Sequence, residues 1–220
     1  RRHSSARPRG GWPCAAPAEM NPTDPRQQAA LDAAVHQIKT TVSSVADRVS
    51  DLLGTMSLSA TRISERDLML SAQFELRRNM ASFHLVFRDQ LRESINKEIA
   101  PREDGRRRLE ATDWHSLSLV DDQEVEQRLY ADRIGAQIAQ ECEWEQRELA
   151  AYMGALLKTG RADEDRNPLR PAILGLCLYR AIESVTKDAE SRKLLARELG
   201  LSLAKAMKPC YAEILRDLQA

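Results

Sequence analysis

The chain has 220 residues, of which 42% are hydrophobic, 30% are charged and 5% are aromatic. Its 33 basic and 33 acidic residues cancel, so the overall charge gives no attraction to nucleic acid or to an anionic membrane. There is no run of about 18 apolar residues and no apolar segment after the first arginines, so the sequence predicts neither a transmembrane helix nor a secretory signal.

Residues 1–23 are expected to form a disordered tail. The stretch RRHSSARPRGGWPCAAPAE is rich in Arg, Pro and Gly and shows no hydrophobic periodicity. A transit peptide is also basic and poor in acidic residues, but this stretch lacks amphipathic spacing. We expect the natural chain to start at Met20, with the preceding residues upstream of that start.

Between residues 31 and 52 an apolar residue recurs every three or four positions. This heptad spacing predicts a helix that buries one narrow seam. The seam consists of Leu31, Val35, Ile38, Val42, Val45, Val49 and Leu52. A coiled-coil dimer and an intramolecular helical hairpin both fit, because the flanking positions are poor in complementary charge. Gly54 and the stretch after it are expected to break the pattern.

A second helix is expected from Ser64 to the residue before Pro101, so that residues 24–100 form a helical hairpin or a coiled-coil-like arm. Its apolar stripe consists of Leu76, Met80, Phe83, Phe87, Leu91, Ile95 and Ile99. Arginines alternate with phenylalanines along this helix, a combination that can bind single-stranded nucleic acid. Since Phe83 and Phe87 fall on the apolar stripe, we favour a buried stripe with the arginines on a solvated face.

Residues 101–120 are expected to be a charged loop and linker. Arg102, Arg106, Arg107 and Arg108 are the candidates for contact with an anionic surface, a nucleotide or a nucleic acid. Arg102 and Arg106 are spaced like the arginine pair of cyclic-di-GMP-binding PilZ domains. However, neither the β-barrel nor the downstream motif of those domains is found, so we favour a solvated basic loop.

Catalytic motifs are not found. In the linker, His115 lies two residues after Asp113 and is the one candidate for acid–base chemistry, but such a pair is common by chance. No HExxH, GxGxxG, GxxxxGK[ST] or GxSxG pattern occurs. We therefore predict no catalytic residue, no metal ligand, and no bound cofactor.

The segment LSLVDDQEVEQRL, residues 117–129, predicts the start of a third helix that runs to about Lys158. With Asp121 as N-cap, Glu124 completes a capping box, and Val120 and Val125 are placed as a hydrophobic staple. A metal site would require a histidine or further carboxylates on one face. Glu126 lies four residues after Asp122, but no histidine follows in this helix, so we favour the capping interpretation. The expected inner face consists of Val125, Leu129, Ile138, Cys142, Leu149, Tyr152 and Leu156.

Two more helices complete a helical bundle over residues 121–220. Asn167 and Pro168 are predicted to be the N-cap and first residue of the fourth helix. A fifth helix is predicted from about Asp188 to the end of the chain, and Gly200 and Pro209 are expected to bend or split it. Taken together, the pattern predicts an all-α fold, an elongated multi-helix bundle with a heptad-patterned N-terminal helix.

The four cysteines are widely separated and form no CxxC pair: Cys14, Cys142, Cys177 and Cys210. This spacing predicts small buried residues in a reducing compartment and not a disulfide framework or a zinc site. We expect the protein to be cytoplasmic.

Three motifs in order resemble a known family. LSLVDD at 117–122, NPLRP at 167–171 and YAEIL at 211–215 resemble the bacterial family called domain of unknown function family 1631. The segment at 65–91 also resembles the family's upstream helix, so the likeness covers roughly residues 60–220. The resemblance implies a bacterial, cytoplasmic, helical protein without assigned catalytic residues. Members are usually longer, so this chain would be the N-terminal part of one.

The predicted function is a non-enzymatic protein-interaction or scaffold module. Its expected partner is protein, either a second copy or the chain's own C-terminal region, with no membrane partner and nucleic acid disfavoured. The alternatives are a regulatory domain that binds a nucleotide or nucleic acid through residues 102–108, or part of an enzyme. Some family members carry the name thymidine phosphorylase, but no glycine-rich phosphate-binding loop is present to support it.

Overall fold

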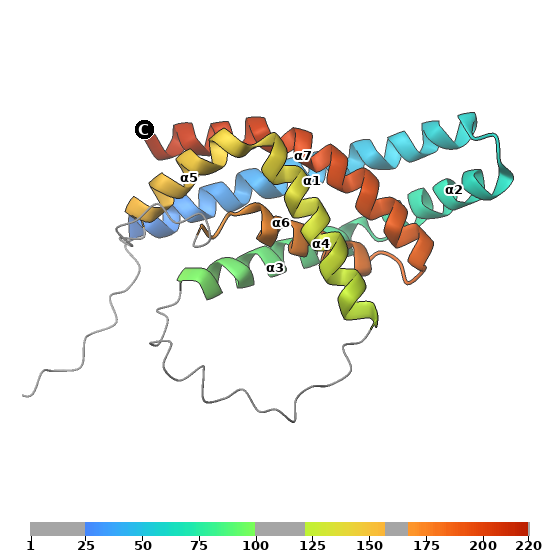
Figure 1. The fold of residues 1–220 in the computed structure, drawn as a ribbon, viewed down its shortest axis with the longest axis horizontal. Coiled ribbons are helices and arrows are strands. Elements are labelled where there is room, and N and C mark those ends of the chain that lie inside the picture. Colours follow the sequence, from blue (N-terminus) through green and yellow to red (C-terminus); the bar gives the residue numbers. More distant parts are fainter. Residues whose placement is uncertain (1–24, 100–121, 157–166, 220) are drawn as a thin grey trace, which may run out of the picture.

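The computed structural model describes residues 25–99, 122–156 and 167–219, where every regular element is a helix (Figure 1). The helices are α1 (Pro25–Ser59), α2 (Ile63–Arg78), α3 (Met80–Ile99), α4 (Asp122–Glu141), α5 (Glu143–Leu156), α6 (Pro171–Glu183) and α7 (Ala189–Gln219). Within these residues there is no β-strand, which confirms the predicted all-α fold class. None of the described helices combines the length and the apolar composition that crossing a membrane requires.

Helix α1 follows the long axis of the molecule, and α7 runs back along it in the opposite direction (Figure 1). The apolar face of α1 packs against α2, α3 and α7 of the same chain. Ile38, Val42 and Val45 on this face are almost completely buried. The seam of α1 is therefore covered by helices of the same chain.

Helix α1 continues through Gly54 and ends at Ser59, so the end of the apolar pattern at Gly54 is not the end of the helix. A glycine inside a helix costs about 1 kcal/mol relative to alanine. Here Leu53 is fully buried, and the Gln73 side chain of α2 packs over Gly54 and donates a hydrogen bond to Ser50 O at 2.9 Å. These contacts with α2 outweigh the weak helix propensity of the glycine.

A turn at Asn79 divides the predicted second helix into α2 and α3. The helical hydrogen bonds continue through it, because Asn79 N–H donates to Glu75 O at 2.9 Å and Phe83 N–H donates to Asn79 O at 3.0 Å. The Asn79 side-chain amide donates to Val185 O at 2.8 Å, in the connection between α6 and α7. The turn is therefore anchored by a residue more than a hundred positions away, which local periodicity does not reveal.

The predicted third helix is likewise two helices, separated by a turn at Cys142. Cys142 is fully buried, and its Sγ lies 3.9 Å from Ala204 O of α7. The turn lets α4 cross α6 and α7 while α5 lies beside α7 (Figure 1).

The predicted inner face of the third helix is partly wrong. Ile138 and Leu149 are buried as expected, but Val125 and Leu129 are more than half exposed. Ala131 and Ile134 take their place in the core. The small side chain of Ala131 is required there because α4 approaches α6 closely, a constraint that the apolar spacing does not show.

The α4–α6 crossing depends on two glycines. A Cβ built on Gly175 would lie 2.2 Å from Ala131 O and 2.8 Å from Gly135 N, and one built on Gly135 would lie 3.2 Å from Ala172 Cα. The backbones are therefore in direct contact, and no side chain larger than hydrogen fits at Gly175 without separating the helices. This contact fixes the position of α4 across the bundle.

Helix α6 begins at Pro171 and not at Pro168, so the predicted N-terminus is wrong by three residues. Asn167 and Pro168 instead form a turn, in which Asn167 Oδ1 accepts a hydrogen bond from Leu169 N–H at 3.0 Å. Leu169 O also accepts a hydrogen bond from Tyr211 Oη at 2.8 Å, and both residues are fully buried. The turn therefore attaches the start of α6 to α7.

Helix α7 begins after Asp188, as predicted, and runs unbroken to Gln219. Asp188 Oδ2 accepts a hydrogen bond from Ser191 N–H at 2.8 Å, which is an N-cap interaction. Gly200 and Pro209 lie inside α7 and do not split it. Leu199, Leu203 and the residues that follow at helical spacing are buried, so packing along the whole length holds α7 together.

The predicted domain limits fall at or beside residues that the structure does not describe, including 1–23 and 101–120, and they stay predictions. The helices on either side of the linker share one core, because α1 packs against α7 and α3 packs against α6. An ion pair at 2.8 Å joins Arg170 Nη2, at the start of α6, to Glu98 Oε1 of α3.

Candidate interaction surface

The predicted seam of α1 is not a free surface in this structure. Its members Leu31, Val35, Ile38, Val42, Val45 and Val49 are buried by the chain's own helices. Leu52 does not belong with them, because it is 40% exposed while Leu53 is fully buried. A second copy could pair with the buried part of the seam only if α2 or α7 moved away.

Other predicted sites lie outside the described residues. These are the candidate anion contacts Arg102, Arg106, Arg107 and Arg108, the pair Asp113 and His115, and the proposed N-cap Asp121 with Val120. Helix α4 begins at Asp122, next to the predicted N-cap. The apolar stripe that contains Phe83 and Phe87 lies within the described residues, and both phenylalanines are buried in the core.

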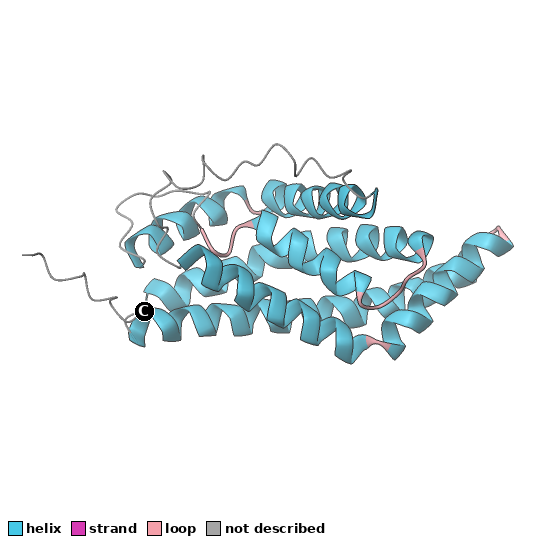
Figure 2. Ribbon diagram, turned by 90° about the horizontal axis from the view of Figure 1, so that it is seen from below, coloured by secondary structure: helices cyan, strands magenta, loops and turns pink. Residues whose placement is uncertain are grey.

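Exposed apolar side chains gather on the α1–α2 hairpin. Of the eleven large apolar side chains that are exposed in the described residues, five lie between residues 52 and 74. They are Leu52, Leu58, Ile63, Leu70 and Phe74. We call residues 52–74 the arm. Its tip extends beyond the other helices in both views (Figures 1 and 2), so these side chains are accessible to another molecule.

One face of α2 carries three of these side chains. Ile63, Leu70 and Phe74 are spaced by seven and four residues, which places them on one side of a helix. Residues two apart in a helix point in opposite directions, so Phe74 lies opposite Ala72 and Leu76. Because Ala72 and Leu76 are fully buried against the bundle, Phe74 points away from it.

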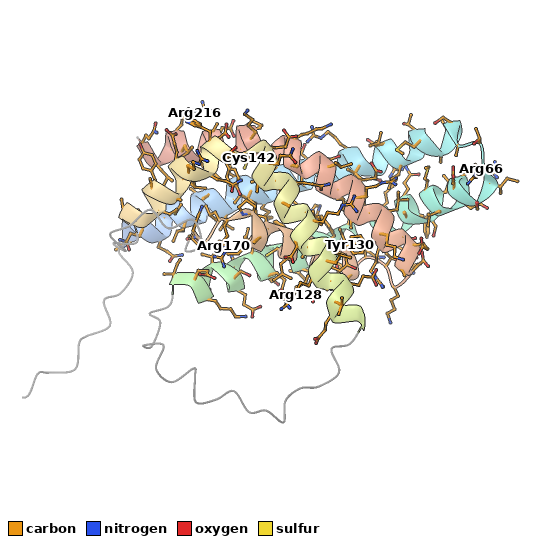
Figure 3. All side chains as sticks on the ribbon, viewed as in Figure 1. Arg66, Arg128, Tyr130, Cys142, Arg170 and Arg216 are labelled. Carbon is orange, nitrogen blue, oxygen red and sulfur yellow. The ribbon has the colours of Figure 1, made fainter. Side chains whose placement is uncertain are left out.

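Two charged residues complete this face. Asp67 and Arg78 continue the spacing, with Asp67 between Ile63 and Leu70 and Arg78 four residues after Phe74. We call Ile63, Asp67, Leu70, Phe74 and Arg78 the outer stripe. Arg66, labelled near the far end of α2 in Figure 3, lies beside the stripe and pairs with Asp67 at 3.6 Å.

A groove between α4 and α6 is a second apolar feature. It has a volume of about 810 Å³, and its lining includes Val125, Leu129 and Leu176. Arg128, labelled on α4 in Figure 3, and Arg180 add positive charge, which Glu124 and Asp132 offset. Nothing in the described residues indicates what would cover this groove.

A smaller cavity of about 500 Å³ lies between α2, α4 and α7. Its lining is mixed, with apolar residues such as Leu68 and Met69 beside several charged ones. Some of the charge is already satisfied: Lys193 Nζ pairs with Glu190 Oε1 at 2.8 Å on the same helix. The cavity therefore has no uniform charge that would select one class of ligand.

A partly buried polar cluster joins α4, α6 and α7. Tyr130 stacks on Tyr179 with 5.6 Å between ring centroids, and Arg192 Nη2 lies 3.9 Å from Glu126 Oε2. Burial raises the pKa of Tyr179, and burial also raises the pKa of Glu183 nearby. Of these residues only Tyr130 lines the cavity between α2, α4 and α7, so we assign the cluster a structural role.

The described cysteines and His84 show no sign of activation. Burial raises the pKa of Cys142 to about 12 and of Cys177 and Cys210 to about 11, so all three are thiols at neutral pH. Burial lowers the pKa of His84, whose Nε2 lies 3.5 Å from Ser43 Oγ. Among the described residues, no group of three His, Cys, Asp or Glu side chains is placed to hold a metal ion.

Comparison with known families gives one match. The model of the family described as protein of unknown function (DUF1631) N-terminal domain matches residues 26–218. The chain belongs to this family. The match begins within α1 and ends within α7, so it covers all seven described helices and confirms the resemblance of the three motifs. No curated protein and no solved structure is significantly similar to the chain.

The outer stripe was missed in the sequence because the apolar pattern of α2 has two sides. Leu68, Leu76 and Phe74 are all apolar, but Leu76 is buried, Leu68 is partly buried and Phe74 is exposed, and only the packing of α2 on the bundle separates them. The spacing of Ile63, Leu70 and Phe74 is a sequence signal for an apolar helix face, but the longer apolar stripe that begins at Leu76 is more prominent.

Proposed function

We propose that this domain is a non-enzymatic protein-interaction module whose contact element is the arm. The observation that carries the proposal is the concentration of exposed apolar side chains at residues 52–74. Leu58 is 88% exposed and Ile63 is 68% exposed, although both are large aliphatic residues. Clustered exposed apolar residues with charged neighbours are typical of protein-binding sites.

The construction of the arm also fits this role. The inner side of the α1–α2 hairpin that carries the arm is fixed by Leu53, Ala72 and Leu76. Next to the arm, a hydrogen bond at 2.7 Å joins Arg77 Nη2 of α2 to Asp51 Oδ1 of α1. The exposed residues are therefore presented on two helices held against each other and not on a flexible loop. A rigid apolar surface loses little conformational entropy when a partner binds.

We also propose that the protein acts in the cytoplasm. The three described cysteines, Cys142, Cys177 and Cys210, are unpaired and buried, and a reducing compartment keeps such thiols in that form.

Site-specific photo-cross-linking tests the interaction. The photoreactive amino acid benzoylphenylalanine is placed at Leu58 or Phe74 of the whole chain, which is expressed in cells of its own organism. Light is expected to produce discrete covalent adducts with protein at both positions, and mass spectrometry identifies the attached chain.

The matched control is Trp144, which is 63% exposed on α5 and outside the arm. An interaction through the arm predicts that cross-links form at Leu58 and Phe74 but not at Trp144. If the arm positions yield no more adduct than Trp144, the arm is not the contact element and the proposal fails.

A further inference from the structure

We infer that the partner at the arm is a second copy of this chain, bound through the outer stripes of the two α2 helices in an antiparallel pair. This inference rests on the proposed function and names the occupant of one part of the arm. Three observations carry it: an apolar centre on the stripe, the order of charges along it, and its position facing away from the bundle.

The apolar centre is Leu70 and Phe74. Phe74 is 63% exposed, and Leu70 lies one helical turn before it on the same side of α2. Because the buried residues Ala72 and Leu76 lie on the other side, a second helix can cover Leu70 and Phe74 without disturbing the packing of α2 on the bundle. The chain's own fold therefore leaves this face free.

The two charged residues of the outer stripe have opposite signs and lie on either side of Leu70 and Phe74. Asp67 lies one turn before Leu70, and Arg78 lies one turn after Phe74. A two-fold axis between positions 72 and 73 sets Asp67 of each copy opposite Arg78 of the other, with Leu70 and Phe74 of both copies between the two ion pairs. In a parallel pair in register, Asp67 would face Asp67 and Arg78 would face Arg78. The order of the charges thus selects an antiparallel second copy.

Both charged side chains are available for these pairs. Within the described residues Arg78 has no ion-pair partner, and it is exposed. In the described part of the chain the one ion-pair partner of Asp67 is the adjacent Arg66, at 3.6 Å, and both of these side chains are at least half exposed. Such exposed pairs contribute little to stability, so Asp67 can exchange Arg66 for the second copy's arginine at small cost.

The size of the surface sets the expected affinity. One helix face per copy is smaller than a standard interface of about 1,600 Å², so we expect a weak and reversible dimer.

Sedimentation velocity of the whole chain, from a few micromolar to several hundred micromolar, tests the inference. The wild-type protein is expected to shift from monomer to dimer over this range. Phe74→Glu is expected to stay monomeric, because it places two carboxylates at the centre of the pair. Leu201→Glu is the matched control, since Leu201 is also exposed, lies on α7 and should leave the dimer unchanged.

Charge reversal tests the antiparallel arrangement. Asp67→Arg and Arg78→Asp are each expected to weaken the dimer at least tenfold, because each places like charges opposite each other. The double variant is expected to recover wild-type affinity, since the two pairs are restored with their signs exchanged. Circular dichroism of every variant checks that these exposed substitutions leave the helices intact.

Three results would overturn the inference: a wild-type chain that stays monomeric at all concentrations, a dimer that Phe74→Glu leaves unchanged, or a double variant that does not recover affinity. Failure here is distinguishable from failure of the proposed function. Cross-links from Leu58 and Phe74 to a different protein, without adducts between two copies, would support an interaction module and reject the second copy as its partner.

Discussion

At the scale of single residues, several side chains hold the ends and turns of the helices. Asn79 attaches the α2–α3 turn to Val185 O, Tyr211 attaches α7 to Leu169 O, and Asp188 caps α7. Each of these side chains bonds to a backbone group that lies at the end of a helix or in a turn and therefore has no partner within a helix. Asp188 is the most accessible to experiment, because it also titrates.

Asp188→Ala is expected to lower the free energy of unfolding by about 1 kcal/mol at neutral pH, since the N-cap of α7 is lost. Asp188→Asn keeps an oxygen acceptor and is expected to cost less. Urea unfolding followed by circular dichroism measures both changes. Equal losses in the two variants would show that the cap geometry is not what stabilises α7.

The same residue predicts a pH effect. The hydrogen bond from Ser191 N–H lowers the pKa of Asp188 below its ordinary value of 3.8. Between the folded and unfolded pKa values the unfolded chain binds more protons, so the contribution of Asp188 is complete above about pH 4 and is lost as the pH falls through the folded pKa. The stability difference between wild type and Asp188→Ala should therefore shrink on acidification below about pH 4. A difference that stays constant down to about pH 2 would contradict this.

At the scale of helices, the closest packing in the bundle is between α4 and α6. Gly175 lies against the backbone at Ala131 and Gly135, so these two helices touch without intervening side chains. Gly54 of α1 differs, because a Cβ there would meet only the end of the flexible Gln73 side chain. Substitutions at the two glycines can therefore be compared to test how much the close approach of α4 and α6 contributes to stability.

Gly175→Ala is expected to destabilise the protein by about 1–3 kcal/mol or more, because the added methyl group forces α4 and α6 apart. Gly54→Ala is expected to change stability by less than about 1 kcal/mol, since the gain in helix propensity offsets the shift of Gln73. Chemical denaturation of both variants measures the difference. A Gly175→Ala protein as stable as wild type would mean that the crossing can widen without cost.

At the scale of the whole molecule, α1 and α7 form an antiparallel pair along the long axis (Figure 1). Each of the other described helices packs against at least one member of this pair. The seam of α1 is buried within this arrangement, so it contributes to the stability of the single chain and not to an exposed surface. The surfaces that a partner can reach are elsewhere, on the arm and in the groove between α4 and α6.

Ile38→Ala is expected to lower the free energy of unfolding by about 2–5 kcal/mol, because Ile38 is fully buried in this core. Leu58→Ala is the control at the exposed tip of the arm and should be close to neutral. Thermal unfolding of dilute protein, where the chain is monomeric, provides the measurement. A neutral Ile38→Ala would indicate that the seam is not buried within one chain in solution.

Residue types and their spacing are enough to predict the all-α class, the family and most of the buried stripes. These follow from residue type and spacing: Ile38, Val42 and Val45, or Phe83, Phe87 and Leu91, mark the face of a helix whatever it packs against. The start of α7 was also visible, since Asp188 provides a cap with its own side chain and local backbone. Three motifs of local helix-start and helix-end residues were enough to identify the family.

Other features of the fold depend on contacts between residues that are far apart in the sequence. Spacing cannot show that the heptad seam pairs with α7, that Asn79 and Cys142 interrupt helices, or that Pro171 and not Pro168 begins α6. The outer stripe of α2 is the clearest case, because Phe74 and Leu76 are both large apolar residues only two positions apart, yet one is exposed and the other is buried. Only the position of the bundle buries Leu76 and leaves Phe74 in solvent, since burial is a property of the assembled fold and not of the residue.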